Sequence, residues 1–164
     1  MAAESDWTDS LLQAWSDLAP GFRVEPYEVT ARISRLALHI GRHQEQVFAR
    51  FGLNRGDVGV LSALRIAGPP NQLSPTRLFK GLMLSSAGIT SRLDRLERLG
   101  MVRRTRHPND RRGILVELTE EGRSVLDRAV RASADAEGEL VAGLEPGELR
   151  ELAALLKKML SRFE

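Results

Sequence analysis

The fold of this chain is decided by one stretch, residues 84–118, which reads LSSAGITSRLDRLERLGMVRRTRHPNDRRGILVEL. Its first part predicts a helix over about 85–99, because an isoleucine and several leucines recur there at helical spacing. Gly100 ends this helix. The pattern then changes to two short β-prone runs, 102–106 and 113–118, which are separated by a turn-rich tip. A helix followed directly by a hairpin is therefore expected.

A second, shorter helix is predicted directly before this one. Ser74 stands at a helix N-cap position and Pro75 at the first helical position, which favours a helix over about 74–83. Two short helices joined by a tight turn form a helix-turn-helix candidate. Its second helix presents small polar and basic residues opposite its apolar face, which suits insertion into the major groove of DNA.

Arginines gather in the same stretch. Residues 85–113 hold eight arginines and three acidic residues, a net charge of +5, whereas the rest of the chain carries −3. A basic patch on a slightly acidic body indicates a polyanionic partner and the place where it binds. A solvated arginine-rich loop is the alternative interpretation.

The rest of the chain is predicted to be helical. Helices are expected over about 6–18, from Pro26 to Gly52, from Asn54 to Gly68, from Thr119 to about 141, and from Pro146 onward. The fold class is therefore mainly α with a small β wing. We divide the chain into N-terminal and dimer helices (6–52), a winged helix-turn-helix lobe (54–118) and C-terminal dimerisation helices (119–164).

Several classes of protein are disfavoured by composition and motifs. The chain has no cysteine, which excludes disulfides and thiolate metal sites. We find no apolar run long enough to span a bilayer, no secretory signal, and none of the common nucleotide-binding or hydrolase motifs. His39 and His43 have helical metal-ligand spacing but lack the zincin glutamate. We expect a cytoplasmic protein that is not an enzyme and has neither a metal nor a cofactor.

The run from Leu82 to Val102 resembles the recognition helix of the MarR family of winged helix-turn-helix regulators. The tip Pro108-Asn109-Asp110-Arg111-Arg112-Gly113 is similar to that family's wing. The resemblance implies a homodimer that binds a pseudo-palindromic operator in double-stranded DNA and is released from it by a small ligand. It also implies that Asp110 braces the wing tip and that Arg112 enters the minor groove.

A finer resemblance concerns the helix that precedes the dimer helix. With two tryptophans, it is similar to the PecS and urate-responsive branch of the family. That branch binds an anionic ligand, and its pattern implies a ligand site of Trp15, Asp57, Arg92 and Arg104. Gly59 stands where the branch has an aspartate, and Asp57 is two residues earlier. Asp57 is also the third residue after a predicted Asn54 N-cap, and Arg92 also suits a DNA contact or an ion pair.

We therefore expect a ligand-responsive transcriptional regulator, most simply a repressor, that binds DNA as a homodimer. The alternative is a helical protein-interaction dimer without a DNA role, which leaves the basic stretch unexplained. The predicted DNA-binding residues are Ser74, Ser85, Ser86, Thr90, Ser91, Arg92, Arg95, Arg106, Asp110, Arg111 and Arg112.

Overall fold

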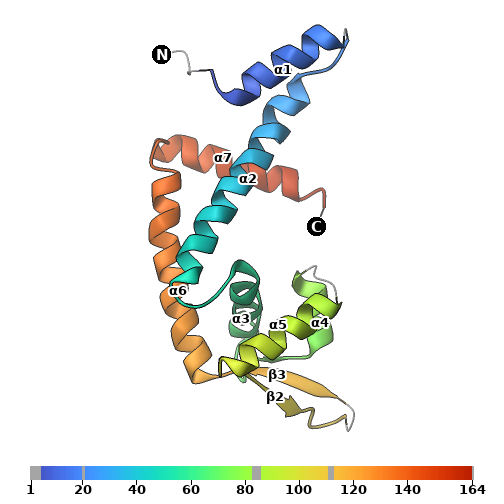
Figure 1. Ribbon diagram of the computed structural model, residues 1–164, viewed down its shortest axis with the longest axis vertical. Helices are drawn as coiled ribbons and strands as arrows, with labels where there is room; N and C mark the ends of the chain where they lie inside the picture. The colour runs from blue at the N-terminus through green and yellow to red at the C-terminus, as the bar shows by residue number, and fades with distance from the viewer. Residues whose placement is uncertain (1–4, 20, 83–85, 111–112, 164) are drawn as a thin grey trace. The chain divides into compact units, whose positions relative to one another are not determined.

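The computed structural model describes residues 5–19, 21–82, 86–110 and 113–163, and Figure 1 shows their fold. Within these residues the elements are α1 (Trp7–Leu18), α2 (Glu25–Ala49), α3 (Arg55–Ile66), β1 (Gln72–Leu73), α4 (Pro75–Leu82), α5 (Ser86–Arg98), β2 (Val102–Arg106), β3 (Ile114–Leu118), α6 (Glu120–Leu140) and α7 (Pro146–Leu160). The predicted helices and hairpin are confirmed. Their ends differ from the predicted ones by up to three residues: α2 ends at Ala49 rather than at Gly52, and α3 at Ile66 rather than at Gly68.

Two compact units divide the chain, residues 1–43 and residues 44–164. In the first unit, α1 begins with a capping box in which Asp6 and Asp9 each accept the other's backbone N–H. Arg32 of α2 donates to both carboxylates, at 2.9 Å to Asp6 and 2.5 Å to Asp9. The guanidinium of Arg35 lies 4.5 Å above the ring of Trp7. Charged groups therefore join α1 to the first half of α2.

The core of the second unit is formed where α3, α5, α6 and the sheet pack together. The inward stripe of each helix repeats every three or four residues, as an amphipathic helix requires. Side chains that are at most 2% exposed include Val60, Leu61, Leu64, Leu78, Ile89, Leu93, Leu96, Val102, Val116, Leu126 and Ala129. This core holds the helix-turn-helix and the base of the hairpin as one body.

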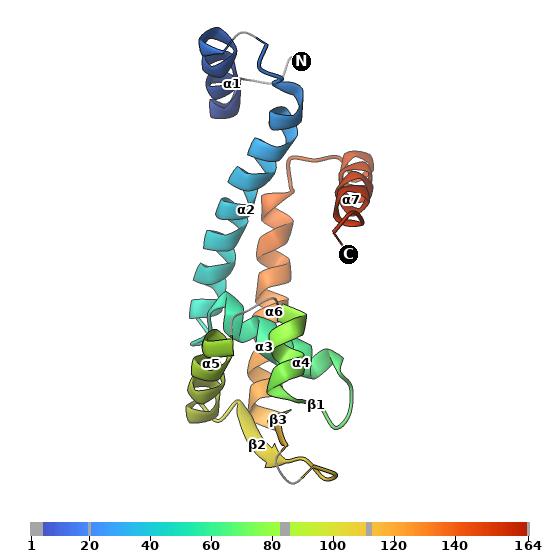
Figure 2. The same cartoon turned by 90° about the vertical axis from the view of Figure 1, so that its right-hand side faces the viewer.

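The sheet has three antiparallel strands rather than the two that the sequence predicts, in the order β1-β3-β2. The added strand is only Gln72–Leu73, which Figure 2 shows beside β3. It directly precedes α4, so it ties the start of the helix-turn-helix to the hairpin. In the register, Glu117 of β3 stands between Gln72 of β1 and Arg103 of β2.

The two ends of the hairpin are joined where α6 begins. Thr119 caps α6 by accepting the N–H of Gly122, and its own hydroxyl donates to the carbonyl of Gly100 at 2.7 Å. The backbone N–H of Thr119 also donates to the carbonyl of Met101. A Cβ at position 122 would lie 2.1 Å from that carbonyl oxygen, so this close approach requires glycine.

Candidate nucleic-acid interface

The second helix of the helix-turn-helix presents its polar face to solvent. Thr90 and Ser91 are exposed on α5, whereas Ile89, Leu93 and Leu96 on the opposite face are buried. The hairpin of β2 and β3 follows directly, and Figure 1 shows it extending below α5. An exposed polar helix with a neighbouring hairpin is the arrangement that places a helix in one groove and a wing on the adjacent backbone.

Two arginines of α5 do not lie free on this face but bind a buried carboxylate. Arg92 Nη1 donates to Asp57 Oδ1 at 3.2 Å and to Asn54 Oδ1 at 2.6 Å. Arg95 Nη1 lies 3.3 Å from Asp57 Oδ2, and its Nη2 donates to the carbonyl of Gly52 at 3.0 Å. The Asp57 side chain is fully buried. We call these three side chains, Asp57, Arg92 and Arg95, the Asp57 clamp.

The same carboxylate also caps α3, as the sequence predicts. Asn54 and Asp57 form a capping box in which each side chain accepts the other's backbone N–H, at 2.9 and 3.1 Å. The start of α3 is held further by Arg55, whose backbone N–H donates to Glu45 and whose Nε donates to Gln44, both in the last turns of α2. The clamp thus connects α5 to the N-terminus of α3, which is in turn connected to α2 through Arg55.

Gly56 leaves the space that the clamp needs. A Cβ at this position would lie 2.2 to 2.4 Å from the guanidinium atoms of Arg92. Within the described residues, Arg92 Nε and Arg95 Nη1 are buried without a hydrogen-bond partner. The two guanidinium groups are held by their ion pairs with Asp57 together with the hydrogen bonds to Asn54 and to the carbonyl of Gly52.

The arginines of the wing strands also have acidic partners, but these partners are more exposed. Arg104 reaches Asp94 and Glu97 of α5, each at 2.5 Å, and so ties β2 to α5. Arg103 pairs with Glu117, which also accepts from Gln72 at 2.8 Å. The hydrogen bond from Arg103 is the main cause that lowers the pKa of Glu117.

One wing arginine is different. Arg106, at the end of β2, is exposed and makes no ion pair with any residue in the described part of the chain. The hairpin tip continues from it. There the backbone N–H of His107 donates to the carbonyl of Gly113, and the N–H of Gly113 donates to the carbonyl of Asp110. A free guanidinium beside a narrow tip is suited to a phosphate or a minor groove.

The remaining predicted DNA-binding residues are placed only in part. Ser74 caps α4, because its hydroxyl accepts the N–H of Arg77 at 3.3 Å. Asp110 is exposed at the hairpin tip. Ser85, Arg111 and Arg112 lie outside the described residues, and of Ser86 only the backbone at the start of α5 is described.

The predicted ligand-binding residues fall into separate groups. Asp57 and Arg92 are brought together in the clamp, whereas Arg104 pairs with Asp94 and Glu97 instead. Trp15 belongs to the first unit, where its ring lies 6.0 Å from that of Phe22, and it is 49% exposed.

The anchoring role of Asp57 was missed by sequence reasoning, although a signal was present. Asp57 stands four and seven residues before Leu61 and Leu64, so it falls on the buried stripe of α3. A carboxylate on such a stripe requires a cation, because an unpaired buried charge is costly. Arg92 lies beside the apolar stripe of α5, between the buried Ile89 and Leu96, and so is a candidate for that cation.

A cluster of metal ligands and a membrane-spanning helix are both absent from the described residues. No group of three or more histidine, aspartate or glutamate side chains there could hold a metal ion. Nor does that part of the chain contain a helix of the length and apolarity that crossing a membrane requires.

Comparison with known proteins identifies the family. Residues 51–113 match the MarR family. The transcriptional regulator PecS of Dickeya dadantii is 34% identical over 149 residues, which cover 91% of this chain and 90% of that protein. The multiple antibiotic resistance protein MarR of Salmonella typhimurium is 37% identical over 62% of this chain and 69% of its own length.

Solved structures agree. A MarR family regulator from Streptomyces coelicolor in complex with DNA has a TM-score of 0.75 and 26% identity, and covers 87% of this chain and 94% of that chain. A MarR mutant from Escherichia coli complexed with operator DNA has a TM-score of 0.72 and 27% identity, and covers 95% of this chain and 99% of that one. By fold, by the exposed face of α5 and by these likenesses, the chain belongs to the MarR family of transcriptional regulators.

Proposed function

We propose that the protein is a ligand-responsive repressor that binds a pseudo-palindromic operator as a homodimer. The observation that carries this is the exposed polar face of α5, with Thr90 and Ser91, beside a hairpin whose Arg106 has no acidic partner among the described residues. The two relatives of known structure named above were solved in complex with DNA, one of them with operator DNA. The function involves no enzymatic step and is exercised in the cytoplasm, where the operator lies.

The dimer would be formed by the N-terminal and C-terminal helices, which flank the DNA-binding lobe (54–118) as segments 6–52 and 119–164. These helices leave large apolar side chains in solvent. On α7, Leu149, Leu152, Leu155, Met159 and Leu160 are all more than a third exposed. An apolar stripe of this length on a protomer of this size favours a partner. Two-fold symmetry then places two recognition helices about one DNA turn apart, roughly 34 Å.

Binding to a duplex from the region upstream of its own gene tests the proposal. We expect a dimer by light scattering, and an affinity whose logarithm falls by about 0.9 per neutralised phosphate for each log unit of salt. A monomer at micromolar concentration, or no binding at low salt, would reject it in favour of the protein-interaction alternative.

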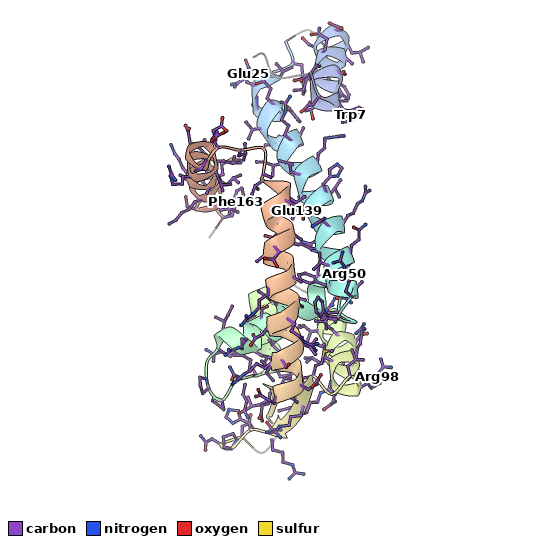
Figure 3. All side chains as sticks on the ribbon, turned by 90° about the vertical axis from the view of Figure 1, so that its left-hand side faces the viewer. Trp7, Glu25, Arg50, Arg98, Glu139 and Phe163 are labelled. Carbon is purple, nitrogen blue, oxygen red and sulfur yellow. The ribbon has the colours of Figure 1, made fainter. Side chains whose placement is uncertain are left out.

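The wing is tested by Arg112→Ala, with Arg98→Ala as its control. We expect the first to cost about 1–3 kcal/mol of binding free energy, as a lost base contact does, because Arg112 is the arginine proposed for the minor groove. Arg98 is exposed at the end of α5, where Figure 3 shows it pointing away from the helix. Its Nε donates only a long hydrogen bond, 3.4 Å, to the carbonyl of Asp94. Equal affinities of the two variants would contradict the proposed wing.

The effector is proposed to be a small planar anion, and Trp15 is proposed to stack on it. Both tryptophans are in the helix over 6–18, so intrinsic fluorescence reports on it directly. A ligand can release DNA only if it prefers the conformation with misplaced recognition helices. Urate, xanthine and aromatic acids are titrated while tryptophan emission and duplex release are followed together. If Trp15→Phe leaves both signals of an active compound unchanged, this site is wrong.

A further inference from the structure

We infer that Asp57 is a positioning residue for DNA binding: it orients the recognition helix by holding Arg92 and Arg95, which serve as anchors of α5 rather than as readers of bases. This rests on the proposed function, because orientation matters only if α5 enters a groove. The inference starts from the burial of Asp57, whose carboxylate has no access to solvent. In the low dielectric of the interior a carboxylate needs nearby cations. Among the described residues, the two cations that pair with it are Arg92 and Arg95, and both belong to α5.

The clamp acts on the orientation of α5 because of where its two arginines are attached. Arg92 and Arg95 are three residues apart, so they lie on one side of the helix about one turn apart. They reach the two different oxygens of one carboxylate, and Arg95 also reaches the carbonyl of Gly52 in the loop after α2. Two points of attachment on neighbouring turns fix both the rotation and the tilt of a helix, whereas one point would leave rotation free.

The geometry also argues against base reading by Arg92. Its side chain is only 23% exposed, and its Nη1 is already shared between Asp57 and Asn54. Reading guanine needs both forked donors of the guanidinium at the floor of the groove. Arg92 could supply them only by leaving a buried carboxylate with one cation fewer, which is a costly exchange.

Gly56 offers a way to break the clamp without changing a charge. The Cβ of Gly56→Ala would fall on the guanidinium of Arg92, which is the far end of a flexible side chain and moves away more cheaply than the backbone. Gly59→Ala is the matched control. It lies in the same helix and gains the same helix propensity, and its Cβ would meet only Leu82, at an ordinary 3.5 Å.

The first measurement is affinity for the labelled upstream duplex over a range of salt concentrations. We expect Gly56→Ala to weaken binding on the order of tenfold, comparable to one lost base contact, with an unchanged salt slope because no phosphate contact is removed. Gly59→Ala should bind as the wild type does. In an Arg92→Gln background, Gly56→Ala should have no further effect. Equal affinities of the two glycine variants overturn the inference, and so does a loss that persists in the Arg92→Gln background.

The second measurement needs no DNA. Amide hydrogen exchange of α5 should be faster in Gly56→Ala than in Gly59→Ala, since a helix that has lost one anchor opens more often. Equal exchange overturns the inference even if no duplex binds. Failure of the proposed function is recognised separately, because in that case the wild type itself does not bind the duplex. If Arg92 reads the DNA instead, Arg92→Gln changes the base preference at one position, whereas Gly56→Ala and Asp57→Asn leave the affinity unchanged.

Discussion

The Asp57 clamp and the ion pairs of Arg104 both hold elements of the DNA-binding lobe together, and they differ in where the carboxylate lies. In the Asp57 clamp the carboxylate is fully buried. In the pairs of Arg104, the partners Asp94 and Glu97 are 51% and 36% exposed. Water competes for an exposed carboxylate and screens its charge, but it cannot reach a buried one. The comparison teaches that burial matters more than distance, because the clamp contacts of 3.2 and 3.3 Å are longer than the two 2.5 Å pairs of Arg104. The attachment of α5 to α3 should therefore be firm and that of β2 to α5 adjustable.

The largest effect is expected from the double variant Arg92→Ala with Arg95→Ala. It leaves the carboxylate of Asp57 buried without a cation, which should lower the free energy of unfolding by about 3–5 kcal/mol. Urea denaturation at one fixed protomer concentration measures it, since a dimer's stability depends on concentration. Adding Asp57→Asn removes the uncompensated charge and should recover part of the loss. A triple variant less stable than the double would show that the charge is not the cause.

A smaller effect is expected from Arg104→Gln. Its side chain is 30% exposed and those of its partners are more so, which places the expected loss of unfolding free energy at about 0–1 kcal/mol. The same denaturation series, repeated in high salt, should show this small loss vanish as the ion pairs are screened. If Arg104→Gln lowers the free energy of unfolding as much as the Arg92→Ala, Arg95→Ala variant does, the exposure of the carboxylate does not determine the strength of these ion pairs.

The smallest effect is expected from the pH dependence of the pair between Arg103 and Glu117. Because the pKa of Glu117 is lowered from about 4.5 in the folded state, the pair stabilises the protein above that pH. Its contribution is lost as the pH falls through the lowered value. Thermal midpoints followed from about pH 6 to about pH 3 should therefore fall less steeply in Glu117→Gln than in the wild type. If the thermal midpoints of the two proteins fall in parallel with pH, Glu117 does not contribute to the acid sensitivity of the fold.

Most of the fold was predictable because its signals are local. Gly100 and Thr119 bound the hairpin, Asn54 begins α3, and the apolar spacing of α5 sets its buried face. β1 was not predictable, since two residues carry no periodicity and their pairing depends on β3, more than forty positions later. The resemblance placed Asp57 and Arg92 in one ligand site, but it did not predict a buried ion pair between them. The two residues are 35 positions apart, so no local pattern joins them. Local patterns show that a charge is buried, but only the packed helices show which cation meets it.

The close contact between Gly122 and Met101 makes the wing an exchangeable part. Its two ends are fastened to each other at residues 100–101 and 119–122, so the path of α6 should not depend on the sequence of the tip. The described residues of the tip, 108–110, are exposed, and exposed loop tips tolerate insertion and replacement. Operator preference can therefore diverge among relatives, or be redesigned, by grafting tips of different length and charge onto an unchanged base. Position 122 is the one that such grafting must leave untouched.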